Sequence, residues 1–151
     1  MRALLQRVTA AGVSLVDDAG AEAPLAAIGP GLVVLVCAEP GDTDETVQYF
    51  ARKVANMRMF EDADGKTNLS IQDVGGQALV ISQFTLAADW KRGNRPGFSG
   101  AADPQTAERL YLAFVDHLKA EGVDVATGRF RSHMRVTLTN DGPFTIWMDS
   151  D

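Results

Sequence analysis

A short polar stretch closes one of the apolar runs of the sequence, and its side chains are the first candidates for chemistry. Ser82, Gln83, Phe84 and Thr85 end the run that begins at Ala78, directly before a glycine-rich segment. Polar groups at the end of a buried strand, next to a loop, are common positions for binding and catalytic residues. Thr85 could attack a substrate as a nucleophile, but no neighbouring base is evident in the sequence. We therefore favour a binding role for Thr85, and a polar strand end without function is the competing interpretation.

The segment that follows, residues 87–100, differs in composition from the rest of the chain. It combines glycines with cationic and aromatic side chains and lacks helical or strand periodicity, which is typical of a functional loop. Cations with aromatic rings suit contact with RNA phosphates and stacking on bases, whereas a solvated turn is the plainer interpretation. These residues are Trp90, Lys91, Arg92, Arg95 and Phe98.

Residues that usually support metal or nucleophilic chemistry are scarce. The chain has two histidines and one cysteine, and it contains no HExxH or CxxC pattern, so we predict no metal site. His117 falls beside the apolar stripe of an expected helix, where a boundary or surface position is usual. His133 lies in a basic segment, where phosphate contact and simple solvation are both open. Cys37 follows an apolar run and is expected to be a small core residue.

Composition and charge narrow the function further. The 151 residues fit one domain, and the 46% hydrophobic and 23% charged residues are typical of globular proteins. The formal net charge of -6 disfavours a non-specific nucleic-acid binder, although a local basic patch could still grip one end of an RNA. No apolar run approaches the ~18–20 residues that span a bilayer. Residues 1–8 do not resemble a signal peptide, and the lone cysteine cannot form an internal disulfide, so we expect a cytosolic protein. We expect one domain over residues 1–151, and we expect it to contact neither membrane nor DNA.

The hydrophobic pattern places these residues among many strands and two helices. Residues 42–56 are expected to form the first helix, with Asp42 as its cap and Glu45 as the capping-box partner, because apolar residues recur at helical spacing. Asp103 begins the second helix, which Gly122 ends. Strands are expected at residues 3–8, 12–16, 32–36, 78–84, 135–139 and 144–148.

These elements indicate a mixed α/β chain of the α+β type. No strand–helix–strand repeat with a phosphate-binding loop is visible in the sequence. We therefore expect a mainly antiparallel, barrel-like sheet with two helices packed on it. In such a fold the polar stretch 82–85 lies at the end of an inner strand, beside the loop 87–100.

Motifs spread along the whole chain together resemble one family. The three most specific are Gln6-Arg7-Val8, Ser82-Gln83-Phe84-Thr85-Leu86 and Asn140-Asp141-Gly142-Pro143-Phe144-Thr145. Further matches are Gly29-Pro30-Gly31-Leu32, Asp73-Val74-Gly75-Gly76, Arg95-Pro96-Gly97-Phe98 and Thr127-Gly128-Arg129-Phe130. In this combination the chain resembles the D-aminoacyl-tRNA deacylases of the bacterial D-Tyr-tRNA(Tyr) deacylase type.

The resemblance implies a cytosolic homodimer with the fold of the D-Tyr-tRNA deacylases. Enzymes of this family hydrolyse the ester between a D-amino acid and the 3′ end of tRNA, and they also remove glycine mischarged on tRNA(Ala). The resemblance implies no metal and no cofactor. The expected partners are the 3′ end of an aminoacyl-tRNA and a second copy of the chain.

The resemblance also implies roles for particular residues. Gly142 and Pro143 would form a chirality gate that reaches into the active site of the partner subunit, with a cis bond between them. Sequence statistics alone leave the isomer open, since only about 5–6% of X–Pro bonds are cis. Arg7 would hold the gate in orientation, and Met134 would belong to the same substrate-binding group. The pocket for the terminal adenosine and the aminoacyl group would be formed by the catalytic residues Ser82, Gln83, Phe84 and Thr85.

Contacts with tRNA are expected from four cationic side chains, and two positions depart from the family pattern. The four cations are Lys91, Arg92, Arg95 and Arg131. Many family members have valine where Phe144 stands, so packing at the gate could differ. The residue at position 131 is often small or polar, and the added charge of Arg131 would strengthen contact with RNA.

Two alternative functions compete with this one. The first is a related aminoacyl-tRNA editing module that removes an L-amino acid, and Asn140-Asp141-Gly142-Pro143 argues for the D-selective version. The second is a non-catalytic, dimeric tRNA-binding protein. The intact segments 82–85 and 142–143 argue against that second alternative.

Overall fold

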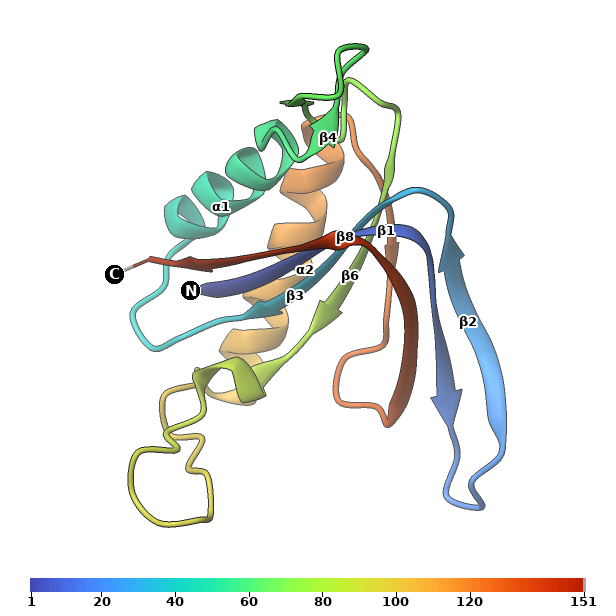
Figure 1. Cartoon of the computed structure of the whole chain (residues 1–151). Helices are drawn as coiled ribbons and strands as arrows, with labels where there is room; N and C mark the ends of the chain where they lie inside the picture. The colour runs from blue at the N-terminus through green and yellow to red at the C-terminus, as the bar shows by residue number, and fades with distance from the viewer. Residues whose placement is uncertain (151) are drawn as a thin grey trace.

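The chain folds into a curved, nearly closed sheet with two helices packed against its outer face (Figure 1). The structure is a computed structural model that describes residues 1–150. Its elements are β1 Arg2–Val16, β2 Glu22–Ile28, β3 Gly31–Cys37, α1 Asp44–Asn56, β4 Phe60–Glu61, β5 Thr67–Leu69, β6 Gln77–Ser82, the 3-10 helix η1 Phe84–Ala87, α2 Pro104–Ala120, β7 Asp124–Thr127 and β8 Met134–Asp149.

The long strand β1 organises the sheet because it pairs with three others. Its first half is antiparallel to β3 and its second half to β2, while β8 runs along its opposite edge from Asp149 beside Arg2 to Met134 beside Leu15. The strand order is β2-β1-β3-β6-β7, with β8 on β1. One strand that serves both halves of the sheet makes the sheet curl, and Figure 1 shows β1 and β8 bending together.

The prediction of a mainly antiparallel sheet is confirmed for the pairings of β1 but is wrong for the inner strands. β3 pairs with β6 in parallel, and β6 pairs with β7 in parallel. The reason is connectivity, since α1 lies between β3 and β6 in the chain and α2 lies between β6 and β7. A helical crossover returns the chain in the same direction, whereas a tight hairpin reverses it.

Both predicted helices are present, and the cap predicted for the first is wrong. Thr43 is the N-cap of α1 and closes a capping box with Thr46, so Glu45 is not the box partner. The Asp42 carboxylate instead accepts hydrogen bonds from the α-amino group of Met1 and the backbone N–H of Glu39, both at 2.7 Å. Over residues 1–150, no helix has the length and apolar character needed to cross a membrane.

Several strand boundaries differ from the prediction because pairing partners extend the strands. Residues 3–8 and 12–16 belong to the single strand β1, and residues 135–139 and 144–148 belong to the single strand β8. The two strands pair with each other on both sides of residues 141–144, which have no partner in β1, and the register shifts around Val8. The strand predicted at 78–84 ends at Ser82, and Phe84 begins the 3-10 helix η1.

Side chains of β3 and β6 alternate between two apolar clusters. Leu32 and Val34 face the helices together with Phe50 and Phe114, whereas Val33 points to the inner side of the curved sheet. This alternation explains why a continuous apolar run is needed at β3, which is buried on both faces.

The parallel pair β3–β6 also depends on a glycine at its start. A Cβ atom at Gly31 would lie only 1.8 Å from the backbone oxygen of Gln77, the first residue of β6. Any larger residue would therefore push the two strands apart and displace the end of β6.

Candidate active site

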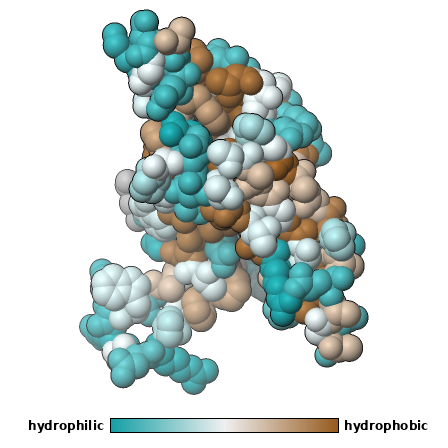
Figure 2. Space-filling view, turned by 45° about the vertical axis from the view of Figure 1, so that its right-hand side comes forward, coloured by the Kyte–Doolittle hydropathy of each residue, from teal (hydrophilic) through white to brown (hydrophobic). Residues whose placement is uncertain are grey.

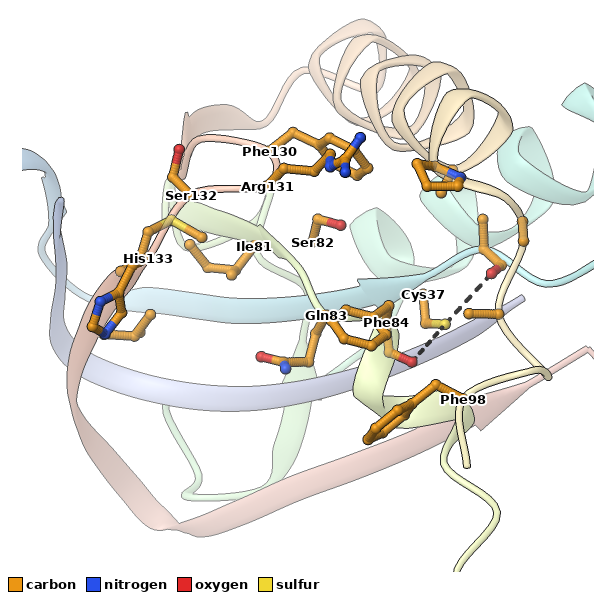
Figure 3. A pocket seen from close by; sticks show the side chains of 17 residues that line it. Cys37, Ile81, Ser82, Gln83, Phe84, Phe98, Phe130, Arg131, Ser132 and His133 are labelled. Atoms are coloured by element: carbon orange, nitrogen blue, oxygen red, sulfur yellow. Dashed lines mark hydrogen bonds between the residues drawn. The ribbon is translucent and has the colours of Figure 1, made fainter. Parts of the chain in front are cut away.

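A pocket of about 620 Å³ opens where β6 ends (Figure 3). Its walls are the ends of β3 and β6, the first residue of η1, the start of α2 and the segment that leads into β8. Ser82, Gln83 and Phe84 line it, as the sequence predicts. Figure 3 shows Ser82 between the ribbon of β6 and the segment that carries Phe130 and Arg131.

The lining of the pocket is apolar with a few polar and basic groups. Phe130 and Phe98 supply aromatic surface, while Arg131 and His133 supply nitrogen donors. Among the described residues that line the pocket, none is an aspartate or a glutamate. Within residues 1–150, no group of three His, Cys, Asp or Glu side chains is arranged to hold a metal ion. This lining suits a ligand that combines a flat ring with anionic or neutral oxygens.

The 3-10 helix η1 sets the position of Thr85 and of two backbone donors. Thr85 is exposed and lies just outside the pocket lining, and its hydroxyl oxygen accepts a 2.6 Å hydrogen bond from the Gln83 amide. The N–H groups of Phe84 and Thr85 begin the helix, where intrahelical acceptors are lacking. The turn therefore leaves two N–H groups and one hydroxyl as candidate donors at the end of β6.

Cys37 lies beneath this turn and fastens it to β3. Its residue is 2% exposed, and its thiol lies 3.6 Å from the backbone oxygen of Phe84 and 3.5 Å from that of Ala38. Burial, and then the nearby charge of Glu39, raise the pKa of the Cys37 thiol to about 11. The thiol is protonated at neutral pH, so Cys37 is a packing and hydrogen-bonding residue that also lines the pocket, and not a nucleophile.

The segment before β8 closes the other side of the pocket. Arg131 has a φ of 55°, the left-handed conformation that few non-glycine residues adopt. The sulfur of Met134 accepts a hydrogen bond from the backbone N–H of Arg129 at 3.3 Å. A Cβ atom at Gly128 would lie 2.8 Å from that same sulfur. Met134 therefore packs under this segment and lines the pocket together with Arg131.

The turn that carries Gly142 and Pro143 lies within β8 and is closed by Asn140. The Gly142–Pro143 peptide bond is cis. The Asn140 amide donates to the backbone oxygens of Arg7 at 2.8 Å and Phe144 at 3.0 Å, and its oxygen accepts from the Phe144 N–H at 3.2 Å. These three bonds tie both sides of the turn to each other and to β1.

Arg7 clamps the same turn from below. The Arg7 residue is 8% exposed, and its Nε donates to the backbone oxygen of Asp141 at 3.0 Å while lying 3.3 Å from the Asp141 carboxylate. Its Nη1 donates to the backbone oxygen of Met59 at 2.7 Å, and its guanidinium lies 4.7 Å from the centre of the Phe144 ring. The phenylalanine at position 144 thus adds a cation–π contact to the clamp.

The structure does not bring all of the predicted site residues together within one chain. Ser82, Gln83, Phe84, Arg131 and Met134 line the pocket. Thr85 lies at its edge beside Gln83. A second cluster, outside the residues that line this pocket, contains Arg7, Gly142 and Pro143.

The basic loop forms a third region beside the pocket. Asp89 and Gly97 exchange backbone hydrogen bonds of 2.8 and 2.9 Å, which close the loop at its base. The next residue, Phe98, stacks edge-on against Phe84 with ring centres 5.1 Å apart, and both line the pocket. Lys91, Arg92 and Arg95 are exposed in the loop beyond this base and do not line the pocket.

Sequence reasoning missed several residues that line the pocket. Cys37, Phe130 and Ser132 contribute to its wall and were not predicted as site residues, while Phe98 and His133 were considered only for contact with RNA. Phe130 belongs to a motif of the family and His133 follows it closely, but no local pattern shows which side chains turn inward. Only the folding of the 128–134 segment over β6 brings them to the pocket.

The sequence matches a known family over nearly all of its length. Residues 4–149 match the family model described as D-Tyr-tRNA(Tyr) deacylase. A protein of Dinoroseobacter shibae named D-aminoacyl-tRNA deacylase is 58% identical over 149 residues, which cover 99% of each chain. A protein of the same name from Neisseria gonorrhoeae is 49% identical and covers 99% of this chain and 91% of its own.

Solved structures share the fold. One named c-Myc DNA Unwinding Element Binding Protein superposes with a TM-score of 0.89 at 35% identity, and the match covers 100% of this chain and 99% of that chain. A second, described as a probable eukaryotic D-amino acid tRNA deacylase, has a TM-score of 0.78 at 18% identity and covers 97% of each chain. At that identity the second likeness concerns the fold alone.

Proposed function

This chain belongs to the D-Tyr-tRNA(Tyr) deacylase family, and from that membership we propose that it hydrolyses D-aminoacyl-tRNA to a free D-amino acid and tRNA. The observation that carries the proposal is the family match over residues 4–149 in a chain whose pocket is lined by Ser82, Gln83 and Phe84. The same activity is proposed for glycine mischarged on tRNA(Ala). The lone cysteine and a tRNA substrate favour the cytoplasm as the place of action.

The reaction requires positioning more than acid–base chemistry, because the substrate is already an activated ester. Water adds to the ester carbonyl carbon, the bond to the ribose 3′-oxygen breaks, and that oxygen leaves with a proton. The backbone N–H groups of Phe84 and Thr85 would stabilise the negative charge that develops on the carbonyl oxygen. The 2′-hydroxyl of the substrate would help to activate the water. This role fits the pocket, because none of the described residues that line it is a carboxylate that could act as the base.

Thr85 is assigned a binding role in this mechanism. The Thr85 hydroxyl oxygen accepts a hydrogen bond from the Gln83 amide. Because that amide N–H is a donor, Gln83 does not act as the base that would activate Thr85 as a nucleophile. Its own O–H is left to donate to the substrate. We expect Thr85→Ala to lower kcat/KM about tenfold, the loss of one hydrogen bond to substrate, with turnover retained. Complete loss of turnover with unchanged tRNA binding would instead identify Thr85 as the nucleophile.

Chirality would be selected by the backbone of Gly142 and Pro143. An L-amino acid would direct its side chain into this backbone, while a D-amino acid would direct it to solvent and glycine has none to clash. Because these residues lie outside the pocket lining of their own chain, we assign the gate to the pocket of a second copy. The proposal therefore requires a homodimer with sites built from both chains.

The requirement for a dimer is testable by dilution. Specific activity should fall in parallel with the dimer fraction measured by analytical ultracentrifugation over the same concentrations. Full activity of the monomer would overturn a gate contributed by the partner subunit.

The decisive experiment compares D-Tyr-tRNA, L-Tyr-tRNA and Gly-tRNA in parallel, with a chelator present. The expected result is hydrolysis of the D and glycyl esters while the L ester is spared. Cleavage of the L ester alone would favour an editing module of other specificity. Tight tRNA binding without cleavage of any ester would favour a non-catalytic tRNA-binding protein.

A further inference from the structure

The loop beyond the Asp89–Gly97 base carries the most exposed large apolar side chain of the described residues. Trp90 is 72% exposed, and it is followed directly by Lys91 and Arg92. In Figure 1 this loop, drawn in yellow, extends below the body of the molecule. Figure 2 shows two projections at the lower edge of the molecule, the loop and the β1–β2 hairpin, with a hollow between them. A single exposed indole is common on protein surfaces, so the groups around Trp90 decide whether it belongs to a binding site.

The loop is physically continuous with the wall of the pocket. Asp89 and Gly97 pair through their backbones at the base of the loop. Trp90 follows Asp89 directly, and the pocket residue Phe98 follows Gly97. Phe98 stacks on Phe84 at the mouth of the pocket. A strand that leaves the pocket on the side of Phe84 and Phe98 would pass the base of the loop.

The ring and the cations of this loop are not occupied by other side chains. Within residues 1–150, no ion pair or side-chain hydrogen bond involves Lys91, Arg92 or Arg95, and no ring or cation stacks on Trp90. Asp89, the nearest carboxylate in sequence, accepts a hydrogen bond from the backbone N–H of Lys91. The loop thus presents an aromatic face and three positive charges to solvent on a chain whose net charge is -6.

We propose that Trp90 stacks on an unpaired base of the RNA strand that enters the pocket, one of the nucleotides just before the terminal adenosine. Lys91, Arg92 and Arg95 neutralise the phosphates on either side of that base. This inference rests on the proposed function, because it takes the pocket to hold the 3′ end of a tRNA. A single strand fits the loop better than a duplex, since a paired strand offers no free base face to an indole.

The kinetic test compares two substrates that differ only in the nucleotides before the adenosine. Trp90→Ala should lower kcat/KM for D-Tyr-tRNA relative to that for 3′-D-tyrosyl-adenosine by about 5- to 150-fold, the range for loss of one base–aromatic stack. The loss should appear in KM, and Trp90→Phe should restore most of it. Tyr49→Ala, which removes an exposed aromatic ring from α1, is the matched control and should leave the ratio unchanged. An equal loss on both substrates, or no loss on either, would overturn the proposal.

A binding test keeps the proposal independent of catalysis. A single-stranded RNA ending in CCA should quench the tryptophan fluorescence of the wild-type chain, whose other tryptophan is Trp147. The quench should be absent in Trp90→Phe and with a blunt RNA duplex of the same length. Equal quenching of Trp90→Phe, or none in the wild type, would contradict stacking on Trp90. If the wild type cleaves neither ester, the proposed function fails, and the fluorescence titration still decides whether Trp90 binds RNA.

Discussion

The turn at Gly142–Pro143 and the loop at residues 90–96 are built in opposite ways. The turn is held by a buried arginine and by an asparagine whose side chain makes three hydrogen bonds. The loop is closed only at its base by the Asp89–Gly97 pair, and all of its residues are exposed. One region therefore presents a backbone held by hydrogen bonds, while the other presents exposed side chains that have no side-chain partner among residues 1–150.

The difference matches what each region would have to recognise. Discrimination between mirror-image amino acids depends on where a single side chain points, so the excluding surface has to be held within fractions of an ångström. An RNA strand has a flexible backbone and repeated charges, so long cationic side chains can follow it at little cost in precision. The turn that would exclude L-amino acids and the loop whose cations would attract RNA are thus separate regions of the fold.

The largest effect is expected when the rigid region loses its clamp. Arg7→Ala leaves the backbone oxygens of Met59 and Asp141 without their donor and removes the contact with Phe144. We expect the free energy of unfolding to fall by about 2–4 kcal/mol. The preference for D- over L-Tyr-tRNA should fall more than tenfold. Urea unfolding and parallel hydrolysis assays measure the two quantities.

The matched control for the clamp is Asp141→Asn. It removes the ion pair but keeps the backbone oxygen that accepts from Arg7 Nε. Because the Asp141 side chain is half exposed, its loss should cost less than about 1 kcal/mol and leave the D preference intact. If Asp141→Asn were as damaging as Arg7→Ala, the ion pair and not the backbone bonds would orient the turn.

A smaller effect, on tRNA binding and not on the D preference, is expected from changes in the loop at residues 90–96. Replacing Lys91, Arg92 and Arg95 together by alanine should raise KM for D-Tyr-tRNA and leave the D preference unchanged. The slope of log affinity against log salt should become shallower by about 2, at about 0.7 for each phosphate contact on a single strand. Thermal unfolding should be nearly unaffected, since none of these side chains has a partner among residues 1–150.

The control for that triple variant removes the same charge elsewhere. Lys53→Ala, Lys66→Ala and Lys119→Ala together take away three exposed cations, which lie on α1, in the turn between β4 and β5, and on α2. The KM of this second variant for D-Tyr-tRNA and its slope of log affinity against log salt should stay close to those of the wild type. Equal changes in both triple variants would mean that net charge, and not the loop, attracts the RNA.

The smallest expected effect concerns the turn between these regions, η1, which Cys37 fastens from beneath. Burial raises the pKa of the Cys37 thiol from 9.0 to about 11, so the unfolded chain loses this proton first as pH rises. The stability contributed by the neutral thiol is therefore complete below pH 9 and is lost between about pH 9 and 11. Urea unfolding should show a steeper loss in the wild type than in Cys37→Ala over that range. Parallel profiles for the two proteins would contradict a buried, protonated thiol.

Local sequence signals predicted the positions of both helices and of β3 and β6, although not the parallel pairing of these two strands. Asp103 caps α2 through the backbone N–H groups of Gln105 and Thr106, as its position before Pro104 indicates. The all-apolar run of β3 is buried on both faces. The sequence predicted each of β1 and β8 as two short strands, and the structure shows one long strand in each place. Neither segment reveals this alone, because β1 and β8 pair with each other from opposite ends of the chain.

The candidate site was predictable where it coincides with a motif and not where it depends on tertiary folding. Ser82, Gln83 and Phe84 end an apolar run and line the pocket. Phe130 and His133 reach the pocket only because the segment before β8 folds over β6, and no local pattern encodes that approach. The separation of Arg7 and Gly142 from the pocket of their own chain is likewise a property of the sheet pairing.

The pairing of β1 with β8 also determines when this protein can finish folding during its synthesis. β1 leaves the ribosome before β8, yet Arg2 pairs with Asp149, and Arg7 contacts Asp141 only after β8 has been made. Until then one edge of β1 has no strand beside it, a state prone to aggregation that chaperones commonly cover. Contacts between such distant residues also slow folding. The clamp around Gly142–Pro143 is therefore among the last parts of the molecule to form, and a truncated chain that lacks β8 is expected to have no such clamp.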